Sequence, residues 1–278
     1  MSIRVHFCPF SIFDCLPRLI QLHYFPSSNS FALLYHYLLM SISKLIKVIA
    51  AIFAVSTYKT LPFAYLLRFH YQVFAHLVRK RPQYLKTKQN TFGVGNHKLD
   101  IFRAVKYSTY ASPLEIDMYL HKSNSTYLLD LDIARSKMVL VVFQKLFMRY
   151  WGNENGEFKR KSIRNSPFIP VGTVQCVFRK EIFVFERYDI VSSVMAWDNK
   201  WLYVLLKFVA SDGRVCCICV TKYVFKKKGR ITMRPREYIE EMGLYNEDVE
   251  KINEQNYKLI DHLETSDGLE ELAARMTP

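Results

Sequence analysis

The first apolar segment of this chain is long and nearly continuous. It runs from residue 31 to residue 58, and its charged interruptions are Lys44 and Lys47. A membrane-spanning helix needs about 20 predominantly apolar residues, and the charge-free part, 48–58, is shorter than that. This part spans a bilayer only if both lysines extend their ammonium groups to the membrane surface.

Aromatic and basic residues share the next stretch, 61–74, as they do in segments that lie in a membrane interface. Residues 79–81 are all basic and, by the positive-inside rule, place the following domain on the cytoplasmic side. We therefore expect residues 40–81 to associate with a membrane, with the endoplasmic reticulum as the favoured location. The alternative is a buried helical extension of the following domain.

Residues 1–39 form either a leader or an extension, and Met40 offers an alternative start. The beginning of this segment is basic and poor in acidic residues, which is typical of mitochondrial transit segments. A mitochondrial location is therefore the alternative to the endoplasmic reticulum.

Residues 98–234 have the pattern of one strand, one long helix and four further strands. Weak alternation predicts the first strand within 102–116. From 124 to about 150, apolar residues recur at spacings of three and four, with further apolar residues all round, and this predicts a buried helix. Runs rich in β-branched and aromatic residues predict strands at 171–181, 187–198, 201–210 and 214–227.

Two short polar breaks predict hairpins between these strands, at 197–201 and at 211–214. The second contains Asp212-Gly213, in which glycine supplies a positive φ. Residues 235–278 follow as an acidic tail with few large apolar residues, and we expect a partly solvated helical appendage there, in pieces at 235–242, 246–263 and 267–276.

The charge of the chain is uneven. The net charge is +14, yet residues from Pro235 onward carry 12 Asp or Glu against 4 Lys or Arg. The rest of the chain is therefore strongly basic, which favours a phosphate-bearing ligand, an anionic membrane or nucleic acid as partner. No motif of a nucleic-acid-binding module is present, so we expect no nucleic-acid partner.

Three of the six cysteines, Cys216, Cys217 and Cys219, lie close together in the chain. Their run alternates like a strand, and no other pair of Cys or His has the spacing of a zinc finger. We therefore expect no metal site, and we interpret the cysteines as small buried residues in a reducing compartment.

The candidate chemistry lies just before the predicted long helix. Asp117 and His121 are four residues apart, and Ser123, Asn124 and Ser125 follow as good helix N-caps. This places an acid/base pair at a helix N-terminus. Unpaired backbone N–H groups and the positive end of the helix dipole at such a terminus suit a developing oxyanion.

The pattern Asp117-x-x-x-His121-x-x-Asn124-x-x-Tyr127, with Asp-x-Ala-Arg135 further along, resembles the hot-dog-fold acyl thioesterase superfamily. The resemblance is greatest to the branch that contains the THEM6-like proteins and the fungal thioesterase-like proteins. Further blocks that fit this family are 170–179, 196–203 and 221–228, so the likeness extends over about residues 100–243.

The resemblance implies an α+β hot-dog fold, with an antiparallel sheet wrapped around one long helix, an N-terminal apolar helical extension and a C-terminal helical tail. It implies hydrolysis of acyl-CoA or acyl-carrier-protein thioesters without a cofactor, by a homodimer whose sites form between subunits. Asp117 would then be the base or nucleophile, and His121 would orient or polarise. The oxyanion donors would be the backbone N–H groups of Ser123, Asn124 and Ser125.

The turn departs from the family pattern at three places, one of which is Ser123-Asn124 where the family usually has Asn-Asn. Tyr119 stands where plant relatives have asparagine, and Leu120 stands where many relatives have glycine. The Tyr119 hydroxyl could still donate a hydrogen bond. The alternative to an enzyme is a catalytically silent hot-dog protein that binds acyl groups or a protein partner at a membrane.

Two further acidic residues lie within the long helix. Asp130 and Asp132 are alternative candidates for the catalytic carboxylate. The simplest interpretation of Asp132 is a helical ion pair with Arg135, three residues on. Asp130 lies in the first turns of the helix, where a negative charge interacts favourably with the helix dipole.

Overall fold

The computed structural model describes residues 28–260, which divide between Val55 and Ser56 into two compact units. The first unit contains α1 (Ser28–Ser56), one continuous helix. From Tyr35 to Ser56 this helix is long and apolar enough to cross a membrane by length and composition, with a mean hydropathy of 2.1. None of the described side chains from 35 to 55 is buried within this unit.

The second unit is built on a five-stranded antiparallel sheet with the strand order β1-β3-β4-β5-β2. The predicted strands are present, with ends that differ by a few residues. Their bounds are β1 Val105–Tyr110, β2 Val171–Phe178, β3 Arg187–Trp197, β4 Leu202–Ala210 and β5 Val215–Tyr223. The last predicted run, 214–227, continues as β6 (Phe225–Lys227), which pairs with β7 (Ile231–Met233) in a separate small sheet.

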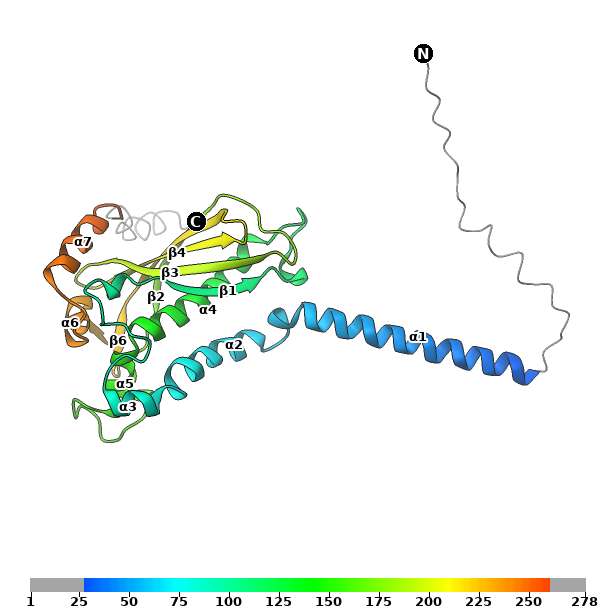
Figure 1. The fold of residues 1–278 in the computed structure, drawn as a ribbon, viewed down its shortest axis with the longest axis horizontal. Helices are drawn as coiled ribbons and strands as arrows, with labels where there is room; N and C mark the ends of the chain where they lie inside the picture. Colours follow the sequence, from blue (N-terminus) through cyan, green and yellow to red (C-terminus); the bar gives the residue numbers. More distant parts are fainter. Residues whose placement is uncertain (1–27, 261–278) are drawn as a thin grey trace, which may run out of the picture. The chain divides into compact units, whose positions relative to one another are not determined.

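Helix α4 (Asn124–Val142) lies along the sheet, as the hot-dog fold requires (Figure 1). It is shorter than predicted, because a second helix, α5 (Gln144–Gly152), begins after Phe143. The Asn90 amide donates hydrogen bonds to the carbonyl oxygens of Val141 at 2.7 Å and Val142 at 3.4 Å. A polar side chain from a distant loop thus satisfies carbonyls at the helix end and stabilises the break.

The second unit begins well before residue 98, the expected start of the domain. The part before residue 98 contains α2 (Ala64–Val73), a single π-helical turn at Phe74–Val78 and α3 (Arg81–Thr87). Helix α2 lies beside α4, on the side away from the sheet (Figure 1). The single-turn 3-10 helices of this unit are Tyr58–Thr60, Asp100–Phe102, Pro113–Glu115 and Ile163–Asn165.

The C-terminal helices contribute to the core more than the acidic composition indicated. The structure describes α6 (Pro235–Glu241) and α7 (Glu247–Tyr257), and the piece expected at 267–276 lies outside the described residues. The side chains of Tyr238, Ile239 and Val249 belong to the main hydrophobic core. The acidic residues Glu237, Glu240, Glu247 and Asp248 are exposed, so the two helices are partly solvated as expected, but their apolar side chains pack into the domain.

A buried ionic cluster joins the N-terminal segment to the helix and the sheet. The carboxylate of Asp130, on α4, is fully buried. It lies 2.9 Å from the Lys59 ammonium, 3.0 Å from that of Lys122 and 2.7 Å from the Arg68 guanidinium. The hydroxyl of Tyr188, on β3, donates to the same carboxylate at 2.5 Å.

Glu115 is the second acid of this cluster. Its carboxylate lies 2.8 Å from the Lys59 ammonium and 3.2 Å from that of Lys122, and it accepts a hydrogen bond from the backbone N–H of Ser112 at 2.9 Å. Burial by itself raises the pKa of Asp130, but the charges of the neighbouring cations outweigh it and hold that pKa well below the usual range. Asp130 is thus a structural anion that holds four chain segments together.

We expect Asp130→Asn to lower the free energy of unfolding by about 3–5 kcal/mol, because three buried cations would lose their main counter-charge. The measurement is urea unfolding of the full chain in detergent micelles, followed by circular dichroism. Asp212→Asn, in an exposed turn, is the matched control and should leave the midpoint nearly unchanged. Equal midpoints for the two variants would contradict this role of the cluster.

Candidate functional site

The predicted turn from Asp117 to His121 is tight and closes on itself. The backbone N–H of Asp117 donates to the His121 carbonyl at 3.0 Å, and the N–H of Leu120 donates to the Asp117 carbonyl at 3.1 Å. Leu120 has a φ of 63°, in the left-handed region that favours glycine. The turn therefore keeps the backbone shape of a glycine turn although a leucine occupies this position.

The turn brings the predicted acid/base pair together. The Asp117 carboxylate and the His121 imidazole are 3.6 Å apart, and both side chains are about a quarter exposed. The same carboxylate accepts a hydrogen bond from the backbone N–H of Tyr119 at 2.9 Å. The Tyr119 ring stacks on the imidazole, with 5.9 Å between ring centroids, and is 72% exposed.

Helix α4 begins directly behind this turn. Ser123 is its N-cap residue, as predicted, but among the described residues no side chain hydrogen-bonds to the first-turn N–H groups. The Ser123 hydroxyl instead pairs with the hydroxyl of Ser125 at 3.0 Å. The positive end of the helix, at Asn124 and Ser125, is therefore available to an oxyanion.

A shallow hollow of about 180 Å³ lies beside the turn and the helix N-terminus. Arg179 and Lys180, basic residues of the loop after β2, line it together with Glu181. Such a surface suits the phosphates of a carrier. His121 and Asn124 also line this hollow, whereas Asp117 does not.

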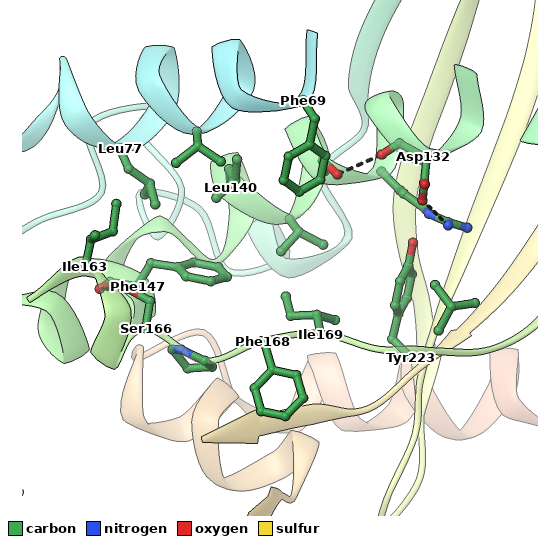
Figure 2. A pocket seen from close by; sticks show the side chains of 16 residues that line it. Phe69, Leu77, Asp132, Leu140, Phe147, Ile163, Ser166, Phe168, Ile169 and Tyr223 are labelled. Carbon is green, nitrogen blue, oxygen red and sulfur yellow. Dashed lines mark hydrogen bonds and ion pairs between the residues drawn. The ribbon is translucent and has the colours of Figure 1, made fainter. Parts of the chain in front are cut away.

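A larger pocket of about 340 Å³ lies between α2, α4, α5 and the segment 163–171 (Figure 2). Most of its wall is apolar. The lining residues are Phe69, Val73, Leu77, Asp132, Arg135, Ser136, Val139, Leu140, Phe147, Ile163, Ser166, Pro167, Phe168, Ile169, Val171 and Tyr223.

One end of this larger pocket is polar. Asp132 and Arg135 form the predicted helical ion pair, and the Tyr65 hydroxyl donates to the Asp132 carboxylate at 2.6 Å. Among the described residues, Nη1 of Arg135 and the hydroxyl of Tyr223 are buried without a hydrogen-bond partner. Both groups can donate a hydrogen bond to a ligand in the pocket.

One face of α4 connects the turn to the larger pocket. Asn124, Leu128, Asp132 and Ser136 follow at a spacing of four, so each lies next to the one before it on the helix surface. The distance along the axis from Asn124 to Asp132 is about 12 Å at 1.5 Å per residue. Leu128, between them, is 48% exposed.

Sequence reasoning missed the contribution of α2 to the pocket wall. The helix has two apolar faces: Phe69 and Val73 line the pocket, while Leu67 and Tyr71 are exposed. The spacing of Tyr65, Phe69 and Val73 at four residues was the available signal for a packed face. Asp130, an alternative catalytic carboxylate in the sequence, is buried in the ionic cluster, whereas Asp132 lies at the pocket.

Comparison with known proteins agrees with this architecture. The profile of the Thioesterase-like superfamily matches residues 111–242. Probable thioesterase YBR096W of Saccharomyces cerevisiae is 38% identical over 222 residues, which cover 80% of this chain and 90% of the yeast protein. Protein THEM6 of Xenopus laevis is 27% identical over 125 residues, covering 44% of this chain and 53% of that protein.

Among solved structures, the DHNA-CoA thioesterase from Staphylococcus aureus aligns with 55% of this chain and 94% of that chain, at a TM-score of 0.41 and 16% identity. Two findings lead to one conclusion. The likeness to the yeast protein extends over most of both chains, and the family profile covers α4 and strands β2 to β5 of the sheet. This chain belongs to the thioesterase-like superfamily of hot-dog proteins.

Proposed function

We propose that this protein hydrolyses acyl thioesters of coenzyme A or acyl-carrier protein at the turn from Asp117 to His121. The observation that carries the proposal is the 3.6 Å approach of a carboxylate and an imidazole at a helix N-terminus that no described side chain caps. Membership of a thioesterase family supports it.

In this mechanism Asp117 removes a proton from water as it attacks the thioester carbon, or attacks that carbon itself as a nucleophile. The carbonyl oxygen gains negative charge, which the first-turn amides of α4 stabilise. The C–S bond then breaks. In the base route the departing thiolate takes up the proton that Asp117 removed from water. In the nucleophile route the thiolate takes a proton from solvent, and water then hydrolyses the acyl–Asp117 anhydride to release the acid and restore the carboxylate. His121 orients the Asp117 carboxylate from the other side of the turn.

The acyl chain would extend along α4 from the turn and enter the larger pocket beside Ser136. An apolar wall with a few polar groups is usual for a site that binds a chain of this kind. The carrier would lie outside, with its phosphates near Arg179 and Lys180 at the smaller hollow. Asp132, inside the pocket, is the alternative catalytic carboxylate.

The proposed assembly is a homodimer formed at β2. This strand is an edge of the sheet, so its outer backbone groups can pair with another strand. Val177 and Phe178, at its end, are 41% and 42% exposed. Phe178 and the neighbouring Arg179 line the smaller hollow, so a second copy at this edge would lie close to the proposed carrier site.

We further propose that α1 anchors the protein in a membrane, with the second unit on the cytoplasmic side and the endoplasmic reticulum as the favoured location. The length and composition of α1 support the anchor. The exposed apolar side chains of α2, among them Leu67 and Tyr71, would lie against the membrane surface.

Asp117→Asn should lower kcat for acyl-CoA hydrolysis by at least about 100-fold while leaving acyl-CoA binding intact, because the amide keeps the shape of the side chain but cannot act as base. The measurement is free-thiol release from short- to long-chain acyl-CoAs. Asp132→Asn is the matched comparison and should lose much less activity.

If Asp132→Asn lost more activity than Asp117→Asn, Asp132 would be the base in place of Asp117. If the folded parent protein binds acyl-CoA but releases no thiol from any chain length, the hydrolysis proposal is wrong. The protein would then be the silent binder that the sequence left as the alternative.

Ser136→Phe should shift the chain-length preference toward short acyl groups, because the added ring occupies the pocket. We expect kcat/KM for long chains to fall roughly tenfold or more, with short chains nearly unaffected. Leu129→Phe, at an exposed position of α4 that does not line the pocket, is the control. An unchanged chain-length profile would show that the acyl group lies elsewhere.

Removal of residues 1–55 should release the protein from membranes washed with alkaline carbonate, whereas the full chain should stay in the pellet. The cut keeps Lys59, which the ionic cluster needs. The measurement is immunoblotting of pellet and supernatant after the wash. Extraction of the full chain to the same extent would rule out α1 as a membrane-spanning anchor.

A further inference from the structure

Strands β2 and β5 bring three thiols together that the sequence keeps apart. Cys176 on β2 is the register partner of Cys219 on β5, and their sulfur atoms are 3.0 Å apart. The sulfur of Cys217 lies 3.5 Å from that of Cys219. All three sulfur atoms lie within 4.8 Å of one another.

The alternation of β5 decides which thiols belong to this cluster. Cys217 and Cys219 are two residues apart, so their side chains point to the same face of the sheet. Cys216, between Val215 and Cys217, points to the other face, and its sulfur lies 3.8 Å from the carbonyl oxygen of Glu181. The thiol cluster is therefore Cys176, Cys217 and Cys219, without Cys216.

We propose that the thiol cluster is a binding site for a thiophilic divalent cation of the Zn²⁺ type, held by three thiolates. A Zn–S bond is about 2.3 Å long, so two sulfur ligands of a tetrahedral site lie about 3.8 Å apart. The sulfur–sulfur distances of 3.0 Å and 3.5 Å are shorter than this and all three are within 4.8 Å, so each is within about 1 Å of the tetrahedral value. Hard cations such as Mg²⁺ and Ca²⁺ prefer oxygen ligands, and the ligands of this cluster are all sulfur.

Charge favours a divalent ion over a monovalent one. Three thiolates leave a net charge of −1 with Zn²⁺ and −2 with Cu⁺, and buried uncompensated charge is unfavourable. Cys176 is the partly exposed member of the cluster, so it provides the entry path for the ion.

The cluster lies on the same pair of strands that supplies part of the pocket wall. Val171 on β2 and Tyr223 on β5 both line the larger pocket and are register partners. An ion bound by Cys176 and Cys219 would cross-link the edge strand β2 to β5. The site would thus stiffen this wall, independently of whether the protein hydrolyses thioesters.

The test is zinc binding by the full chain in detergent micelles. The protein is reduced with a phosphine, stripped with a chelator and titrated with Zn²⁺ against a chromophoric competitor. We expect one Zn²⁺ per chain, with release of thiol protons. Co²⁺ in place of Zn²⁺ should give a thiolate-to-cobalt charge-transfer absorption band.

Cys176→Ser and Cys219→Ser should each weaken Zn²⁺ binding at least about tenfold, since loss of even an outer-shell partner costs roughly 10–100-fold. Cys216→Ser, a buried cysteine of the same strand outside the cluster, is the matched control and should bind like the parent. Circular dichroism of the metal-free variants shows whether each is folded.

Two results would overturn the proposal. One is unchanged Zn²⁺ affinity in the folded Cys176→Ser and Cys219→Ser variants. The other is a reduced, folded parent protein that takes up no Zn²⁺, as expected if the thiols only pack or form a Cys176–Cys219 disulfide under oxidising conditions.

Discussion

The rest of the structure depends on one buried carboxylate. Asp130 accepts contacts from Lys59, Arg68 and Lys122 and from the Tyr188 hydroxyl, so it joins the N-terminal segment, α2, α4 and β3. The charges left in the cluster without it would be costly to bury. Each partner of Asp130 comes from a different segment of the chain. The cluster therefore fixes the positions of these segments relative to one another, in addition to stabilising the fold.

The position of α2 follows from this cluster, and the larger pocket follows from the position of α2. Arg68 holds the helix against α4 by its contact with Asp130. Phe69, the next residue, forms part of the pocket wall together with Asp132 of α4 (Figure 2). The ionic cluster and the pocket therefore use adjacent residues of α2. Arg68 contacts Asp130 in the cluster, and Phe69 lines the pocket.

Helix α4 unites the features that the proposed chemistry needs. Its N-terminus lies at the Asp117 turn, one of its faces leads to the pocket, and another contributes Asp130 to the core. The left-handed Leu120 shows that the turn has kept its shape while its sequence departs from the family pattern. The shape of the turn is thus kept by a different sequence, and the shape alone does not establish its chemistry.

The sequence by itself determined the features that local patterns control. Alternation set the strands from 187 to 223, Asp-Gly set the hairpin at 213, and Ser123 marked the start of α4, because each depends on neighbouring residues only. The tertiary structure alone decided the pairing of Lys59 with Asp130, the approach of Cys176 to Cys219 and the break that Asn90 stabilises after Val142. Each of these joins residues more than 40 positions apart, and no periodicity along a chain encodes which distant side chains will meet.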